Sequence, residues 1–263
     1  MRVISNFFLV NLKGGIGNQL FILSKVYKCQ LGLTSPKIII NTGSLRLAHS
    51  PRSLFAFGII PLGEGCKLVN SRFISVCLKV ISKFISQKDF FFNNRLLTVF
   101  DGYFQDEEIS DDYVLKLLTL FTNGEHVKVY QDKVLIHTRG GDYFNEVNSK
   151  IYFNQTSNQI ALLLQNQKSQ IDVIGNNEFI LKGSYPNANF KSSNEFDDLK
   201  SFLSYKTIIA SNSTFGLWGT LLAIFNGNVE KLYLPRNYYV DIERNPFKLV
   251  FDKYNRQLDI IWY

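Results

Sequence analysis

An arginine between a strand pattern and two glycines is the clearest chemical group in this sequence. It belongs to the segment His137–Asp142 (HTRGGD), which directly follows the apolar run Val134–Ile136. A short apolar run bounded by turn residues predicts a buried strand. Arg139 therefore lies where a strand ends and a loop begins, which is where open α/β sheets bind ligands. Because a guanidinium binds two oxygens at once and glycines let a ligand approach the backbone, the pattern favours a phosphate or diphosphate site.

Two further segments place small residues between a predicted strand and a predicted helix. Gly14–Gln19 (GGIGNQ) follows the strand pattern Phe7–Leu12, and Ser211–Phe215 (SNSTF) follows Thr207–Ala210. The first N–H groups of a helix have no partner within the helix and can bind an anion. Small hydroxyl residues also cap helices without a ligand, so either segment can be a plain turn. The glycine spacing matches neither a Walker A loop nor the dinucleotide fingerprint.

Together with a fourth segment, these motifs resemble the bacterial α-1,2-fucosyltransferases (glycosyltransferase family 11), which transfer fucose from GDP-fucose. That family has GG-x-GNQ-x-F, GY-aromatic-Q, H-x-R-R-x-D-Y and SNS-[ST]-F-x-x-W. The corresponding segments here are Gly14–Phe21, Gly102–Gln105, His137–Tyr143 and Ser211–Trp218. Their order and spacing fit over nearly the whole chain. Any one could arise by chance, whereas four in order are a fairly specific signal.

The resemblance implies a GT-B-like α/β fold with two facing Rossmann-like halves and mostly parallel sheets. It implies inverting transfer of L-fucose from GDP-β-L-fucose to a glycan hydroxyl, forming an α-1,2 linkage, in O-antigen, lipopolysaccharide or other surface polysaccharide synthesis. The acceptor would then be a glycan, in some cases lipid-linked, at the inner face of the bacterial inner membrane. The sequence has no Asp-x-Asp segment to hold a metal on the diphosphate, so we expect no metal or other cofactor.

The same resemblance assigns roles to individual residues. Arg139 is the expected catalytic residue, because a cation stabilises the charge that grows on the departing diphosphate. His137 and Asp198 would recognise the nucleoside. The residues expected to bind the donor are Gly14, Gly15, Gly17, Asn18, His137, Arg139, Asp198, Ser213, Thr214 and Phe215.

Several of these residues also have a purely structural explanation. His137 can be a packed histidine at a strand end with a satisfied hydrogen bond. Asp198 lies near a predicted helix start, where carboxylates are common because of the helix dipole. Asp142 is better suited to orienting its loop than to catalysis. The general base that inverting transfer needs stays open among Asp106, Glu107 and Asp142.

Three positions depart from the family pattern. Gly140 replaces the second arginine of H-x-R-R-x-D, which removes one expected diphosphate contact. Asn176 and Asn177 follow the predicted strand Ile171–Ile174, where the family commonly has two aspartates. Amides still hydrogen-bond a ribose or base. The changes nevertheless keep open a transferase of the same fold that uses another GDP-sugar, such as GDP-colitose.

Composition narrows the classes of function. The chain has 263 residues, of which 46% are hydrophobic and 19% charged, and its net charge is +7. The basic residues are scattered, which disfavours nucleic-acid binding. A dinucleotide-dependent oxidoreductase is a more distant alternative. That class places an acidic residue at the end of the second strand, where this sequence has Asn41. Cys29, Cys66 and Cys77 are widely spaced, which fits a reducing cytosol. No signal peptide or membrane-spanning run is recognisable, so we expect a cytoplasmic protein.

Alternating patterns predict two α/β halves, residues 1–124 and 125–263, with the glycine-rich turn and acceptor side in the first and GDP-sugar binding in the second. A C-terminal segment could pack back on the first half. The other predicted strands are Lys37–Asn41, Leu96–Phe100 and Lys231–Leu234, and the predicted helices are Gln19–Leu31, Lys67–Ser86, Glu107–Phe121, Phe153–Leu164, Asp197–Tyr205 and Phe215–Phe225.

The predicted helix Lys67–Ser86 has an aromatic apolar face and a basic polar face. Packing of the apolar face on its own domain is the favoured interpretation. The alternative is peripheral association with an anionic membrane.

Overall fold

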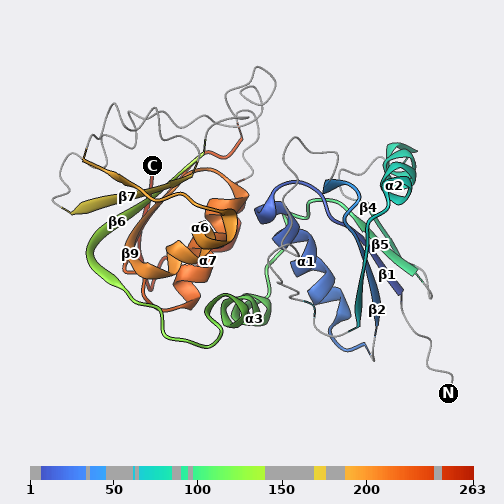
Figure 1. Ribbon diagram of the computed structural model, residues 1–263, viewed down its shortest axis with the longest axis horizontal. Helices are drawn as coiled ribbons and strands as arrows, with labels where there is room; N and C mark the ends of the chain where they lie inside the picture. Colours follow the sequence, from blue (N-terminus) through green and yellow to red (C-terminus); the bar gives the residue numbers. More distant parts are fainter. Residues whose placement is uncertain are drawn as a thin grey trace. The chain divides into compact units, whose positions relative to one another are not determined.

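The computed structural model describes residues 7–33, 36–45, 62, 65–84, 90–93, 97–139, 169–175, 187–239 and 245–263. The chain divides into two compact units, Met1–Lys116 (unit 1) and Leu117–Tyr263 (unit 2). Each unit is built on one mostly parallel sheet with helices beside it (Figure 1), which confirms the predicted α/β class. Some features named in the sequence lie outside the described residues, namely the predicted helix Phe153–Leu164 and the positions Gly140, Asp142, Asn176 and Asn177.

In unit 1 the described strands form one sheet in the order β3-β2-β1-β5-β4. All neighbours pair in parallel except β4 and β5, which are antiparallel. The strands are β1 (Phe7–Asn11), β2 (Lys37–Asn41), β3 (Cys66–Val69), β4 (Phe90–Asn93) and β5 (Leu97–Asp101). The helices are α1 (Ile16–Gln30) and α2 (Arg72–Phe84), on opposite sides of the sheet (Figure 1), and α3 (Asp111–Thr122), which contains the division between the units.

In unit 2 the described strands form a second sheet in the order β11-β10-β9-β6-β7-β8, and every neighbouring pair is parallel. The strands are β6 (Tyr130–Thr138), β7 (Gln170–Gly175), β8 (Asn189–Phe190), β9 (Tyr205–Ala210), β10 (Lys231–Leu234) and β11 (Asp259–Trp262). The helices are α6 (Glu195–Ser201), α7 (Thr214–Phe225) and α8 (Pro246–Phe251), with 3-10 turns at Phe202–Ser204 and Asp252–Tyr254. In Figure 1, α6 and α7 lie together on one side of this sheet.

Strand order reverses once in each sheet. From β1 the chain builds β2 and β3 on one side and then returns to place β5 on the other; from β6 it builds β7 and β8 and then places β9 on the other side. Loops that leave the carboxyl ends of the two central strands at such a reversal diverge, which leaves a crevice suited to a ligand. We call the carboxyl ends of β1 and β5 the unit 1 switch point, and the carboxyl ends of β6 and β9 the unit 2 switch point.

The two faces of each sheet are packed by alternate residues of the strands. In unit 2, Val134, Ile136, Val173 and Ile209 form one buried cluster with Tyr233. In unit 1 the side chains of Phe8 and Val10 are buried, whereas Leu9 on the opposite face is half-buried. This alternation is what a strand period of two requires.

Three predicted helices needed correction. The predicted helix Glu107–Phe121 begins only at Asp111. The range Lys67–Ser86 begins with strand β3, which pairs with β2, and the helix starts only at Arg72. Ser71 marks this start, since its Oγ accepts from the Ile74 N–H at 3.3 Å. The predicted helix Asp197–Tyr205 starts earlier, after the Asn194 cap, and ends before Tyr205, which opens strand β9.

No helix in the described part of the chain is long and apolar enough to cross a bilayer. Cys29, Cys66 and Cys77 are free thiols, each half-buried. Burial raises the pKa of the Cys29 and Cys66 thiols, so these side chains are protonated near neutral pH.

Candidate functional site

The unit 2 switch point joins two of the predicted motifs. The Oγ of Ser211 lies 3.0 Å from Nδ1 of His137, and the Ser211 backbone N–H donates to the His137 carbonyl oxygen at 3.1 Å. His137 stands opposite Ala210 in the parallel pairing of β6 with β9. The pairing of these strands therefore brings together segments that are 74 residues apart in the sequence.

His137 is held by aromatic packing. Its ring stacks on Phe215 with centroids 5.4 Å apart and lies 5.6 Å from the ring of Phe202. A Cβ on Gly216 would lie 2.8 Å from Nδ1, so this position of α7 has no room for a side chain. Burial, assisted by the charge of Arg139, lowers the pKa of His137 to about 3. His137 is therefore neutral near pH 7 and is suited to hydrogen bonding and packing, not to proton transfer.

The start of α7 is capped by its own sequence. Ser213 is the N-cap residue, and its Oγ accepts from the Gly216 N–H at 2.9 Å. The first two N–H groups of the helix belong to Thr214 and Phe215, and groups at these positions have no partner within the helix. Ser213 and Thr214 are buried, while Phe215 is half-buried. The motif thus serves helix capping, and it also directs two backbone donors to the carboxyl edge of the sheet.

Arg139 directly follows the last residue of β6 and is half-buried. Its charge is close enough to His137 to lower the pKa of that imidazole. The prediction that Arg139 lies at the carboxyl end of a buried strand is confirmed, since residues 134–138 of β6 are buried.

Asp198 is tied to the neighbouring strand β7. Its carboxylate accepts from Ser192 Oγ at 2.7 Å and from the Ser193 N–H at 3.0 Å. The Gly175 N–H in turn donates to Ser192 Oγ at 3.3 Å at the end of β7. Burial raises the pKa of Asp198, and the bonds from Ser192 and Ser193 oppose that rise. Asp198 therefore closes the start of α6 onto the sheet edge, and its contact with a nucleobase stays a prediction.

The unit 1 switch point joins the other two motifs. Gln105 Nε2 donates to Asn18 Oδ1 at 2.8 Å, which links the glycine-rich turn after β1 to the segment after β5. Gly14 has φ +74°, and a Cβ there would lie 2.6 Å from Asn18 Nδ2. The Gln19 side chain donates to the Gly14 carbonyl oxygen at 3.0 Å, which fixes the turn. This conformation is one that glycine adopts without strain.

Gly15 and Gly17 differ in their surroundings. Gly15 is exposed, its φ is −68°, and a Cβ built on it would meet nothing within 4 Å. Gly17 is buried in the first turn of α1. Open space beside the backbone, which the sequence could only suggest, is therefore present at Gly15.

A buried polar network that the sequence reasoning missed lies beneath this turn. Asp101 Oδ1 accepts from Asn11 Nδ2 at 2.9 Å and from Lys13 Nζ at 3.0 Å. Asn41 Nδ2 donates to Asn11 Oδ1 at 3.1 Å and to Ser75 Oγ at 2.9 Å, so strands β1, β2 and β5 and helix α2 are joined. Each of Asn11, Asn41 and Asp101 is the polar residue that ends an apolar strand, which is the signal that could have found them.

The candidate bases remain unranked. Glu107 accepts from Lys25 Nζ at 2.8 Å, Asp106 follows the second motif directly, and Asp142 lies outside the described residues. Within the described ranges, no three His, Cys, Asp or Glu side chains gather as metal ligands. The expectation of metal-independent transfer stays a prediction.

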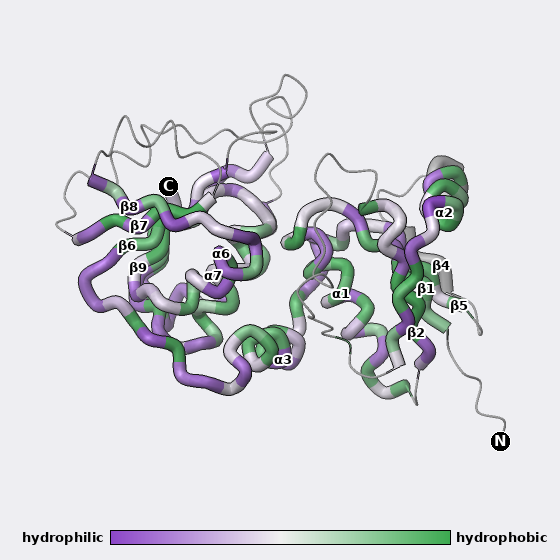
Figure 2. Tube along the Cα trace, viewed as in Figure 1, coloured by the Kyte–Doolittle hydropathy of each residue, from purple (hydrophilic) through white to green (hydrophobic). Residues whose placement is uncertain are grey.

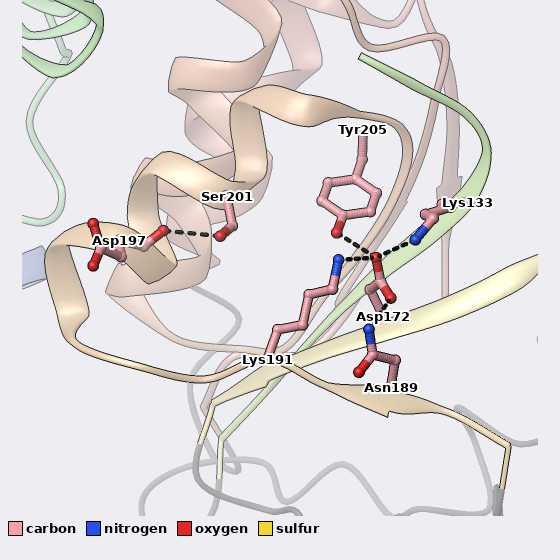
Figure 3. Close-up of polar contacts among 7 residues, drawn as sticks. All are labelled: Lys133, Asp172, Asn189, Lys191, Asp197, Ser201 and Tyr205. Carbon is pink, nitrogen blue, oxygen red and sulfur yellow. Dashed lines mark hydrogen bonds and ion pairs between the residues drawn. The ribbon is translucent and has the colours of Figure 1, made fainter. Parts of the chain in front are cut away.

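A second polar cluster in unit 2 lies away from the switch point, toward the amino ends of β6, β7 and β9 (Figure 3). Its centre is the fully buried carboxylate of Asp172, which accepts from Lys191 Nζ at 2.7 Å and Tyr205 Oη at 2.6 Å. Asn189 Nδ2 and Lys133 Nζ donate to it at 3.1 and 3.4 Å. Burial alone would raise the pKa of Asp172, but these hydrogen bonds hold it below its usual value. The cluster ties β6, β7, β8 and β9 together and was also missed, although a carboxylate inside an apolar strand is a recognisable signal.

No protein-family model matches this chain, and no curated protein matches it either. The resemblance to α-1,2-fucosyltransferases therefore depends on the four motifs and on where they lie in the fold.

Proposed function

We propose that this protein is an inverting glycosyltransferase of GT-B-like architecture that moves L-fucose from GDP-β-L-fucose to a hydroxyl of a glycan acceptor, with an α-1,2 linkage. The observation that carries the proposal is the pairing of the four motifs. Gly14–Gln19 meets Gly102–Gln105 at one switch point, and His137–Arg139 meets Ser211–Phe215 at the other. Both meeting places lie at the carboxyl ends of neighbouring parallel strands where the strand order reverses, which is where α/β sheets bind ligands.

In this proposal, the groups that stabilise the departing diphosphate belong to unit 2. As the bond between the sugar carbon and the β-phosphate oxygen breaks, negative charge grows on the diphosphate. The Arg139 guanidinium supplies a permanent positive charge, and the Thr214 and Phe215 N–H groups supply donors at a helix start. His137 holds β6 against β9 through Ser211 and so positions Arg139. Ser213 acts by capping the helix that carries the two N–H donors.

Unit 1 has a turn of its own that is suited to a sugar ligand. Gly15 leaves open space beside its backbone. The Asn18 side-chain oxygen already accepts a hydrogen bond from Gln105. The NH₂ group of the same amide is therefore the part of Asn18 that would donate to a sugar hydroxyl. Asp106 and Glu107 lie directly after the second motif and are the described candidates for the group that takes the acceptor proton. An O-antigen or other surface-glycan acceptor at the cytoplasmic face of the membrane belongs to the same proposal.

The test is release of the nucleoside diphosphate, GDP from GDP-fucose, GDP-mannose or GDP-colitose and UDP from a UDP-sugar, in the presence of EDTA and at high enzyme concentration. We compare the wild type with Arg139→Ala and with Arg256→Ala, an exposed arginine in the same unit that serves as the control. Release from GDP-fucose that is lost in Arg139→Ala and kept in Arg256→Ala supports the proposal. Release only from GDP-colitose would keep the reaction class and replace the donor.

If no donor releases its nucleoside diphosphate, binding of GDP and of NADH is measured by calorimetry. Binding of GDP that weakens in Arg139→Ala supports a transferase that turns over only with its acceptor. Binding of NADH without GDP would transfer the protein to the oxidoreductase class. Absence of GDP binding ends the transferase proposal.

A further inference from the structure

Helix α2 in unit 1 presents apolar side chains to solvent. Phe73, Val76 and Val80 are 77%, 50% and 49% exposed. Their spacing of three and four residues puts them on one face of the helix. Exposed apolar side chains are normal when they are scattered, whereas a row on one helix face indicates a binding surface. We call these three residues the α2 apolar row.

The apolar row is not the side by which α2 packs on its own unit. Leu78 is buried and packs with Val99, and Ile74, Leu9 and Leu97 pack against this pair. Ser75 on the same inner side reaches the buried network through Asn41. The helix is therefore fixed to the sheet by one face while the apolar row points away from it. The favoured expectation, packing of the apolar face on its own domain, is wrong for Phe73, Val76 and Val80, because the helix packs through Ile74 and Leu78 instead.

Positive charge borders the row. Arg72 and Lys79 are exposed, and the helix sequence Arg72–Phe84 has a further lysine and no Asp or Glu. Lys67 on the edge strand β3 is also exposed and stands opposite Ile39, on the sheet face that α2 covers. Figure 2 shows apolar and polar residues alternating along α2. An apolar row bordered by cations is complementary to an anionic headgroup layer above a hydrocarbon interior.

We propose that α2 is an interfacial helix that docks unit 1 onto an anionic lipid bilayer. The apolar row enters the boundary between headgroups and acyl chains, and Arg72, Lys79 and Lys67 contact lipid phosphates. Three side chains on one short helix bury far less than the roughly 800 Å² per partner of a stable protein interface, whereas they suit a reversible membrane contact that charge assists. The proposal does not depend on the proposed glycosyl transfer, and it names the element of unit 1 that would contact a membrane.

The test is co-sedimentation of the full chain with vesicles of phosphatidylcholine alone or with added phosphatidylglycerol, at low and high salt. The variants are Phe73→Ser/Val76→Ser/Val80→Ser and Arg72→Glu/Lys79→Glu. The matched control is Lys248→Glu/Leu249→Ser on α8, where both side chains are exposed on a helix of unit 2. We expect salt-sensitive binding to the anionic vesicles, weakened about tenfold or more by either α2 variant and unchanged by the control. Because only exposed side chains change, each variant should unfold at the wild-type temperature.

Equal sedimentation with and without phosphatidylglycerol overturns the proposal, as does anionic binding that neither α2 variant weakens. A concentration-dependent dimer that the apolar-row variant abolishes, without vesicle binding, would assign the row to a second copy of this chain and also overturn it. GDP release by the same variants should stay at the wild-type rate. Failure of the membrane proposal and failure of the transferase proposal are thus read from separate measurements.

Discussion

The two switch points occupy equivalent places in their sheets and are built from different groups. In unit 1, hydrogen bonds between amide and carboxylate side chains hold the strand ends together, as between Asn11 and Asp101 near the glycine-rich turn. In unit 2 the edge is packed by rings around a neutral imidazole, with one hydroxyl contact between His137 and Ser211. A polar network fixes direction because each bond needs its geometry, whereas ring packing fixes position by excluding space. The difference shows that one topology supports two ways of holding a loop.

The same contrast extends to charge and space. The unit 1 cation, Lys13, is balanced by Asp101 at 3.0 Å and lies over the Tyr103 ring. The unit 2 cation, Arg139, lies beside a histidine that stays neutral. Open space is found at Gly15, whereas Gly216 has none. Unit 1 thus has open space beside the backbone of its turn, and unit 2 has a cation beside a neutral histidine.

The largest expected effect is a difference between the two cations, since Arg139 should matter for turnover and Lys13 for stability. Arg139→Ala should lower GDP release by about 10²–10³-fold, the usual loss when a transition-state charge partner is removed, and should leave thermal unfolding nearly unchanged. Lys13→Ala should instead lower the unfolding temperature, because it leaves the buried Asp101 carboxylate without its cation. Steady-state release and thermal scans on both variants measure this. Equal loss of turnover in the two variants would contradict the division of tasks.

The next effect tests whether stability in unit 2 resides away from its switch point. Asp172→Asn should cost about 1–3 kcal/mol in chemical unfolding near neutral pH, because a buried acceptor of several hydrogen bonds is changed. The lowered pKa of Asp172 means that its stabilisation is complete above the ordinary value of 3.8 and is lost as pH falls through the folded pKa. The variant should therefore be less sensitive to acid.

The control for Asp172 is Glu230→Gln, which removes the partner of Lys206 in an exposed pair. It should change stability by less than about 0.5 kcal/mol. A larger loss in Glu230→Gln than in Asp172→Asn would refute the importance of the buried cluster.

A pH-dependent effect follows from the neutral state of His137. Its pKa is about 3 in the folded protein and 6.5 ordinarily, so between these values the unfolded chain binds more protons. This contribution to stability is complete above pH 6.5 and declines as pH falls toward 3, by at most about 1.4 kcal/mol per pH unit. His137→Asn should be less stable near neutral pH, with a gap to the wild type that narrows below pH 6.5. Urea unfolding over a pH series measures the gap, and a constant gap would count against burial of the neutral ring.

The smallest effect on stability is expected at Gly15. Gly15→Ala should change the free energy of unfolding by less than about 0.5 kcal/mol, because its φ is ordinary and its Cβ meets nothing. A fall in donor turnover would then report a ligand that approaches this backbone. Gly14→Ala is the comparison, since strain at φ +74° should lower stability as well. Unchanged turnover in Gly15→Ala would remove the turn from the donor site.

Much of the fold was predictable because strands here are short apolar runs between turn residues. Lys37–Asn41 and Lys231–Leu234 match β2 and β10 in both bounds. Strand β3 was missed because Cys66–Val69 leads into a helical period without a glycine or proline between them. The edge strands β4, β8 and β11 were missed, because a strand of two to four residues is too short to show a clear alternation of apolar and polar residues.

The candidate site was predictable in its parts and not in its pairings. The rule that ligands bind at strand ends found Arg139, Gly14–Gln19 and Ser211–Phe215. The neighbour relation of β6 and β9 depends on contacts distant in sequence, so the bond from Ser211 to His137 could not be read from local patterns. The pKa of His137 likewise follows from burial that only the folded sheet creates.

The order of synthesis gives the strand pairing in unit 2 a consequence for folding. Strand β6 has nine residues and pairs on one side with β9, which the ribosome delivers only after β7 and β8. Until then one edge of the longest described strand exposes unpaired N–H and C=O groups, which are a template for association with other chains. A nascent or truncated chain that ends before Tyr205 should therefore require chaperone protection, and the bond from Ser211 to His137 can form only after β9 has joined the sheet.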